Sequence, residues 1–363
     1  MKKVKLTSVC RPKQWKSIPI SELSDVGYPV YGANGVIGYY DSYNHEQETV
    51  IITCRGATCG TVNLTHPRSY VTGNAMCLDN VKDSVDIKYL FYSMQEYDFT
   101  KVISGTAQPQ ITRVGLEKVE FALPSLDVQR EIVSILDKID TLIEKRRLQL
   151  KKLDDLIKAR FVEMFGDPVY SAIDSKIELS DICEKITDGE HGSVARVANG
   201  HPFLNAKHIL KTGVIDWKTI TYIGDEDHQR IYKRCNPEKG DILLTTTGTI
   251  GNVAIMPECE EVSMDRGITL LKINRHKVTS EFVAEMLKHP SIQMAMGANV
   301  HASAIGHLFM NKVKKLPSIL PSMKKQIEFT TFVQQIDKSK ATVQKALDET
   351  QLLFDSLMQQ YFG

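Results

Sequence analysis

Two long stretches of this chain repeat each other, and this repeat constrains the fold more than any other feature. Residues 123–166 align without a gap with residues 320–363, at an offset of 197 positions. Both stretches begin with Leu-Pro-Ser and end with Phe-Gly, and eleven aligned positions are identical. A repeat of this length indicates that one structural unit is built twice.

Both stretches carry apolar residues in the pattern i, i+3, i+4, i+7, which predicts a long amphipathic helix. Pro124 and Pro321 fit the helix starts, because proline is tolerated only before or within the first turn, and Gly166 fits the first helix end. We expect about 36 residues per helix, or roughly 54 Å. One helix of that length cannot bury its apolar stripe, so we predict that the two pack as an antiparallel coiled coil. Two core helices of a bundle are the alternative.

The stretches that precede the two helices repeat in the order of their elements. Each holds a strand-like run, a glycine loop, a second strand-like run, a helical segment and a small polar loop: 48–56, 56–62, 74–81, 87–97 and 104–115 in the first, and 240–248, 248–254, 267–274, 281–296 and 297–307 in the second. We therefore predict an α/β (α+β) fold in which two similar modules alternate with two long helices. The expected domains are 1–122, 123–166, 167–319 and 320–363.

The composition gives no direct hint of a polyanion or of a membrane. The net charge is +1, so a nucleic acid would have to meet local basic faces. The seven cysteines form no CxxC pair and their number is odd, which favours reduced thiols. No apolar run approaches the roughly 18 residues of a membrane span, and the first residues lack the apolar core of a signal peptide. We predict a soluble, cytoplasmic protein.

In combination, these residues resemble a known family, the specificity subunits of type I restriction-modification systems. The resemblance covers nearly the whole chain and is carried by the helix starts together with the segments YPVYGANGVIGYYDSYN (28–44), RGATCGTV (55–62), SGTAQPQIT (104–112), FLNAKHI (203–209) and EKGDILLTTTGTIGNVAI (238–255). It implies two target-recognition modules that each bind one half of a split site in double-stranded DNA. It also implies that the long helices set the spacing of the half-sites and dock methyltransferase subunits.

The same resemblance implies a non-catalytic chain without a cofactor of its own. S-adenosylmethionine and ATP are expected only in partner subunits, and whether restriction or translocase subunits join the complex stays open. The expected partner-binding residues lie on the apolar stripes of the two helices: Ile132, Ile139, Leu142, Leu153, Phe329, Ile336, Val343 and Leu353.

Base reading needs polar or basic side chains on loops that reach the groove edges. Loop placement alone selects two sets of DNA-binding candidates. The first module offers Arg55, Thr58, Asn74, Lys101, Gln108, Gln110, Thr112 and Arg113. The second offers His191, Asn205, Lys207, His208, Thr246, Thr247, Thr249, Asn252, Arg266, His301 and Ser303.

Two other classes of function stay in view, a self-contained DNA-modifying enzyme and a scaffold whose modules bind protein. The glycine loops match no dinucleotide or P-loop pattern, and tight turns explain them better. The segment GDPVY (166–170) faintly resembles a methyltransferase loop, but a helix end is the better account. Glu190 and His191 could form an acid/base pair, although a polar loop near DNA is favoured. The histidines of the second half lack metal-ligand spacing, so no metal site is predicted.

Overall fold

The computed structural model describes residues 3–105, 108–175, 177–300 and 306–363. The chain divides into two compact units, Met1–Leu148 with Gln344–Gly363, and Gln149–Val343. Each unit holds one module and one part of each long helix. Within the described residues, no helix combines the length and the apolar character that crossing a membrane requires.

The module of the first unit is built on two sheets. A four-stranded sheet has the order β2-β8-β5-β6, and a three-stranded sheet has the order β4-β3-β7. The elements of this module are β1 (Lys3–Lys5), η1 (Leu6–Ser8), β2 (Arg11–Lys13), η2 (Ile20–Glu22), β3 (Tyr28–Gly32), β4 (Gly35–Tyr40), β5 (Val50–Thr53), β6 (Val62–Leu64), β7 (Tyr70–Val71), β8 (Ala75–Asp79), α1 (Ile87–Glu96), η3 (Phe99–Lys101), β9 (Ile103–Ser104), β10 (Gln110–Ile111), α2 (Arg113–Leu116) and β11 (Glu120–Ala122).

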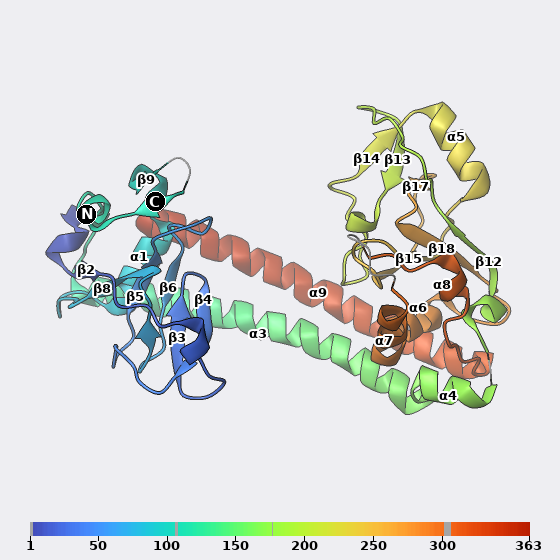
Figure 1. Cartoon of the computed structure of the whole chain (residues 1–363), viewed down its shortest axis with the longest axis horizontal. Helices are drawn as coiled ribbons and strands as arrows, with labels where there is room; N and C mark the ends of the chain where they lie inside the picture. Colours follow the sequence, from blue (N-terminus) through green and yellow to red (C-terminus); the bar gives the residue numbers. More distant parts are fainter. Residues whose placement is uncertain (1–2, 106–107, 176, 301–305) are drawn as a thin grey trace. The chain divides into compact units, whose positions relative to one another are not determined.

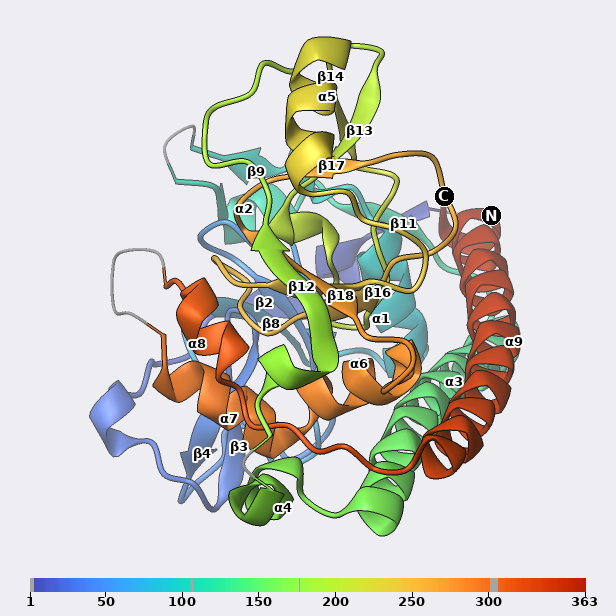
Figure 2. The same ribbon diagram turned by 90° about the vertical axis from the view of Figure 1, so that its right-hand side faces the viewer.

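The module of the second unit repeats both sheets strand for strand, with the orders β12-β18-β15-β16 and β14-β13-β17. Figure 2 shows β12 beside β18, with α6 below them. The elements are α4 (Pro168–Ser175), η4 (Leu179–Ile182), β12 (Cys183–Asp188), β13 (His201–Leu204), η5 (Ala206–His208), β14 (Thr221–Ile223), α5 (Asp225–Arg234), β15 (Ile242–Thr245), β16 (Val253–Ile255), β17 (Ser263–Met264), β18 (Ile268–Ile273), α6 (Ser280–Lys288), α7 (Pro290–Ala298) and α8 (Met310–Lys314). The predicted duplication of an α/β module is therefore confirmed.

The central strands β5 and β15 are buried along their whole length because both faces of their sheets are covered. Side chains alternate between the two faces of a strand. Val50 and Ile52 accordingly join the core that α1 and the long helices complete, while Ile51 packs toward the three-stranded sheet. In the second module Leu244 and Leu243 divide in the same way.

The long helices are α3 (Leu126–Phe165) and α9 (Met323–Phe362), each of 40 residues (Figure 1). In the second unit, Arg160 of α3 pairs with Glu328 of α9 at 2.7 Å, and Asp154 of α3 pairs with Lys340 of α9 at 2.7 Å. Contacts that advance along α3 thus move backwards along α9, so the helices pack antiparallel. Coiled-coil winding stays a prediction.

In the first unit, the N-terminal part of α3 and the C-terminal part of α9 also pack antiparallel. The Arg146 guanidinium donates to the Ala346 carbonyl, and Met358 joins the same apolar cluster as Ile132 and Leu136. Gly166 follows α3 with a φ of 73°, and its amide donates to the Val162 carbonyl, which confirms the predicted helix end.

One buried glutamine fastens each long helix to its module. The Gln129 amide accepts a hydrogen bond from the Asp86 N–H at 2.9 Å, and donates to the carbonyls of Ser84 at 3.0 Å and Pro124 at 2.9 Å. Gln326 makes the same three bonds, to the Thr279 N–H and to the carbonyls of Lys277 and Pro321. Asp86 and Thr279 are the N-caps of α1 and α6. Each glutamine therefore ties the start of a long helix to the helix that covers its sheet.

One predicted helix differs from the structure. The helical segment expected over 281–296 is two helices, α6 and α7, that meet at His289 and Pro290. Proline removes a helical N–H but suits the first turn, so it ends α6 and begins α7.

Candidate nucleic-acid interface

The polar loops of the first module meet at one end of its sheets, which we name tip 1 (residues 33–35, 54–60 and 108–113). The Ile111 amide donates to the Cys54 carbonyl at 3.0 Å, and the Gly56 amide donates to the Pro109 carbonyl at 3.2 Å. Arg55 and Gln110 lie opposite each other in an isolated β-bridge. The loop after β5 and the segment around β10 therefore form one surface.

The second module builds the corresponding tip 2 (residues 205–207, 246–252 and 306–308) with the same backbone bonds. The Leu308 amide donates to the Thr246 carbonyl at 2.9 Å, and the Gly248 amide donates to the Gly306 carbonyl at 3.4 Å. Thr247 and His307 occupy the bridge positions. The backbone frame is thus repeated, while the side chains that it presents differ.

One glycine in each tip adopts a backbone conformation that other residues rarely adopt. Gly56 has a φ of 87° and Gly248 a φ of 74°, values that disfavour a side chain at each position. The interpretation of the glycine loops as tight turns is therefore confirmed.

Tip 1 gathers most of the first set of candidates. Arg55, Thr58, Gln108, Thr112 and Arg113 are exposed and Gln110 is half-buried. The Thr58 hydroxyl donates to Asn34 Oδ1 at 2.6 Å, and the Thr112 hydroxyl caps α2 by accepting from the Gly115 amide.

The other two candidates of the first set lie beside tip 1. Exposed Asn74 supplies the carbonyl that accepts from the Cys54 amide. Lys101, on η3, faces Asp98 at 3.7 Å.

Tip 2 brings together a smaller share of the second set. Thr247 and His307 share a hydrogen bond of 2.7 Å. The hydroxyl of exposed Thr249 donates to the Ala206 carbonyl at 3.4 Å. Asn205 donates to Asp265 Oδ2 at 2.8 Å, which places the start of η5 beside the turn that precedes β18. Lys207 and Arg266, from these same two segments, are exposed.

Three residues of the second set have structural roles instead. His208 and Thr246 are buried, at 0% and 1% exposure, so neither can reach a groove edge and both leave the candidate set. His208 Nδ1 accepts from the Asn205 amide, and burial lowers the pKa of this histidine, so the ring stays neutral inside the module. The Asn252 amide donates to the Ile209 carbonyl at 2.8 Å. His301 and Ser303 lie outside the described residues.

The acid/base alternative for residues 190 and 191 is wrong. His191 pairs with Asp188 at 2.8 Å, and Glu190 pairs with Arg230 at 2.5 Å. The Gly192 N–H and the Arg230 guanidinium hold the pKa of Glu190 below its usual range. Within GDPVY, Gly166 ends α3, which confirms the helix-end interpretation, and Asp167 caps the start of α4 by accepting from the amides of Val169 and Tyr170.

One cluster in the first module combines metal-binding residue types. Among the described residues, His45, Cys77 and Asp79 alone bring three such groups within 4.8 Å of one another. His45 faces Asp79 Oδ1 at 3.0 Å and Asn44 Oδ1 at 2.6 Å. Both ring nitrogens thus already meet an acceptor, and burial raises the pKa of the Cys77 thiol. The cluster is a hydrogen-bonded part of the module rather than a vacant ligand set.

Sequence reasoning missed two tip residues, Asn34 and His307. The signal for His307 was present, because the 197-residue offset places it on Gln110. Asn34 carried a turn signal, because Asn-Gly pairs favour hairpin turns, and it lies in the turn between β3 and β4. Its contact with Thr58 could not be predicted, because it depends on how the two sheets pack.

The predicted partner-binding residues divide by burial. Ile132 and Phe329 are buried in the cores of the modules, so they are not available to a partner and the prediction is wrong for them. Ile139, Leu153, Ile336 and Val343 are half-buried. Leu142 and Leu353 are exposed, and further apolar side chains share this exposure: Leu148, Leu156 and Val162 on α3, and Ile327 and Leu352 on α9. These residues are the part of the predicted partner-binding stripes that stays accessible in this chain.

Comparison with known proteins agrees with this architecture. The model of the type I restriction modification DNA specificity domain matches residues 1–152 and 176–350. A type I restriction enzyme specificity subunit of Haemophilus influenzae is 23% identical over 326 residues, which cover 85% of this chain and 80% of that protein. An Escherichia coli type I restriction enzyme specificity subunit is 32% identical over 115 residues, which cover 32% of this chain and 28% of that protein.

A solved structure shares the fold. The S subunit of a type I restriction-modification system from M. genitalium has a TM-score of 0.61 at 16% identity, and the match covers 100% of this chain and 96% of that one.

Proposed function

Because the chain belongs to the family of type I restriction modification DNA specificity domains, we propose that it is the DNA-recognition subunit of such a system. Each tip binds one half of a bipartite sequence in double-stranded DNA. The chain itself is non-catalytic, and S-adenosylmethionine and ATP bind to partner subunits.

The observation that carries this proposal is the pair of equivalent tips. The same backbone bonds hold Arg55 against Gln110 in tip 1 and Thr247 against His307 in tip 2. One frame that presents different polar side chains suits two readers of different sequences, because hydrogen-bonding groups at the groove edges distinguish the bases. A protein-binding scaffold has no need for this combination.

The long helices supply the second part of the proposal, the docking of methyltransferase subunits. The exposed apolar residues Leu142, Leu148, Leu352 and Leu353 lie on parts of α3 and α9 that belong to one unit. Their burial against partner helices would remove apolar surface from water, which favours association. Half-buried Ile139 extends this surface.

Methylation mapping tests the function as a whole. Genomic DNA from cells with the gene and from cells that lack it is sequenced for methylated bases. We expect a bipartite motif with a fixed gap that is methylated only when the gene is present. Identical methylation in both strains would contradict the proposal.

Titration of S-adenosylmethionine onto the purified chain separates this proposal from that of a self-contained enzyme. The recognition subunit is expected to show no saturable binding. Saturable binding to the chain alone would favour the enzyme.

A further inference from the structure

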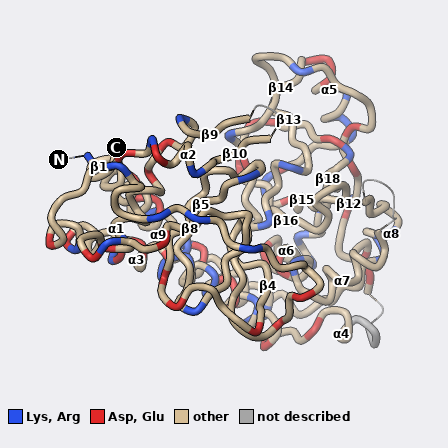
Figure 3. The backbone as a smooth tube through the Cα atoms, turned by 60° about the vertical axis from the view of Figure 1, so that its left-hand side comes forward, with Lys and Arg blue, Asp and Glu red and all other residues tan. Residues whose placement is uncertain are grey.

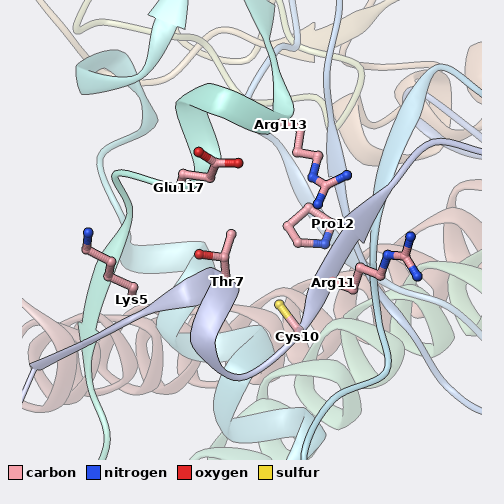
Figure 4. A pocket seen from close by; sticks show the side chains of 7 residues that line it. All are labelled: Lys5, Thr7, Cys10, Arg11, Pro12, Arg113 and Glu117. Carbon is pink, nitrogen blue, oxygen red and sulfur yellow. The ribbon is translucent and has the colours of Figure 1, made fainter.

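A cleft of about 390 Å³ opens in the first module between η1, β2 and α2 (Figure 4). Its charged lining consists of Lys5, Arg11, Arg113 and Glu117, three cations and one carboxylate, which gives a net charge of +2. Arg11 and Arg113 come from different elements and carry their guanidinium groups on the same side of the cleft. All four side chains are exposed, and within the described residues none of the three cations forms an ion pair.

Figure 3 places Lys and Arg positions along β1 and at α2, the elements of Lys5 and Arg113. The cationic lining is therefore gathered from segments that are distant in sequence and close in the fold. Unpaired cations that line a cleft form an electropositive surface, which attracts an anion.

The second module allows an internal comparison, because its backbone has the same hydrogen bond at the position of the cleft. The Leu6 amide donates to the Val119 carbonyl at 2.9 Å, and the Leu179 amide donates to the Leu316 carbonyl at 2.9 Å. Counting back from these bonds matches Lys5 with Glu178. The sheet register matches Arg11, opposite Asp79, with Lys185, opposite Lys272.

The same count matches Arg113 with Met310, the first residue of α8, and Glu117 with Lys314. The corresponding place in the second module therefore carries one carboxylate, Glu178, and two cations, Lys185 and Lys314, a net charge of +1. Two of the three cations of the first module, Lys5 and Arg113, thus have no cationic counterpart in the second.

The cleft lies next to tip 1. Arg113 follows Gln110 by three residues, so their backbones lie within roughly 11 Å of each other. Successive phosphates of one DNA strand are separated along the axis by about 3.4 Å. A duplex read by Gln110 would therefore pass phosphate groups within reach of Arg113 and Arg11.

We propose that Arg11, Arg113 and Lys5 bind a phosphodiester of the DNA backbone beside the half-site of the first module. This inference rests on the proposed function. The contact is independent of sequence, because phosphates carry no base information. The guanidinium groups suit this role, since their planar donors match phosphate oxygens. The second module keeps only one of these three cations, as Lys185, so the DNA backbone is held less strongly beside its half-site.

Salt dependence of DNA binding measures the contact directly. Each neutralised phosphate contributes about −0.9 to the slope of log K against log salt on B-DNA. The full chain, assembled with its methyltransferase subunits, is titrated with a duplex that carries the mapped motif and with a scrambled duplex. We expect Arg11→Gln with Arg113→Gln to flatten the slope by about 1 on both duplexes. The ratio of the two affinities should stay the same.

A control and a reciprocal variant sharpen the test. Lys118→Gln removes an exposed cation outside the cleft and should leave the slope unchanged. Met310→Arg places a guanidinium at the position of Arg113 in the second module, which already carries Lys185, and should steepen the slope by about 1. Equal slopes for the wild type and the double variant would overturn the proposal.

A further arm separates DNA from a small anion. Saturable binding of inorganic phosphate at submillimolar concentration, without any effect of the variants on the DNA slope, would assign the cleft to a small anion and overturn the proposal. If the wild-type complex binds neither duplex, the proposed function itself has failed, and this result is distinct from an unchanged slope.

Discussion

At the residue scale, the two buried glutamines show what the repeat did and did not reveal. Gln129 and Gln326 are identical positions in the aligned stretches, so the sequence marked them. The sequence did not show their partners, however, because two of the three hydrogen bonds of each glutamine reach residues more than forty positions away. The sequence did not mark the burial of His208 either, although its partners, the Asn205 N–H and the Thr219 carbonyl, lie only three and eleven positions away.

Gln129→Ala is expected to destabilise the first unit. The substitution leaves one N–H and two carbonyls without their partner, and a buried unsatisfied group costs about 1–3 kcal/mol. We therefore expect a loss of about 3 kcal/mol in the free energy of unfolding, measured by urea denaturation. Gln149→Ala, on an exposed position of α3, is the control and should be neutral. Equal midpoints for both variants would contradict the anchoring role.

His208 predicts a pH dependence of stability. Burial is the main cause that lowers its pKa in the fold from the ordinary value of 6.5, so the unfolded chain binds more protons between the two pKa values. The stabilisation is fully present above the unfolded pKa and is lost as the pH falls through the folded one. Between about pH 7.5 and about pH 5.5, the melting temperature of the wild type should fall more than that of His208→Gln. The exposed His191→Gln should behave like the wild type, and parallel profiles for all three would refute this role.

At the element scale, periodicity predicted the long helices well. Their starts, the end of α3 and their amphipathic character follow from local sequence, and the structure extends the expected 36 residues only to 40. Which apolar residues face outward could not be predicted, because Ile132 and Leu142 belong to the same stripe. Only the position of the module decides that the first is buried and the second exposed.

Leu142→Asp combined with Leu353→Asp should weaken assembly with methyltransferase subunits by at least about tenfold, which corresponds to about 1.4 kcal/mol. Both residues are exposed in the chain by itself, at 41% and 50%, so the fold should tolerate the change. An interface would bury the new charges without partners, which is costly. Analytical size exclusion reports assembly, and Thr141→Asp with Ser356→Asp serves as the control. Intact complexes with the leucine variants would rule out this docking surface.

At the scale of the whole molecule, the repeat predicted the architecture because each copy contains a complete set of elements. The two units each combine one module with one part of both long helices. The predicted boundaries at 123 and 320 mark the helix starts in sequence, whereas the compact units divide within the helices, near residues 148 and 343. Sequence alone could not show this division, because it depends on the antiparallel contacts between α3 and α9.

If the helices set the gap between the half-sites, lengthening both should widen it. Four residues inserted after Leu148 and four after Val343 add roughly 6 Å to each helix and nearly preserve its apolar face. With about 3.4 Å per base pair, the gap in the methylated motif should grow by one to two base pairs. Two-residue insertions rotate the face by about 200° and should abolish assembly. An unchanged gap in a complex that still methylates would show that the helices do not set the spacing.

The central claim is that each module reads its own half of a bipartite sequence. Exchange of residues 1–122 for the corresponding module of another family member, followed by sequencing of methylated genomic sites, tests this claim most directly. The account predicts a new motif in which one half has changed while the other half and the gap length stay the same. A motif in which both halves change, or neither does, would contradict it.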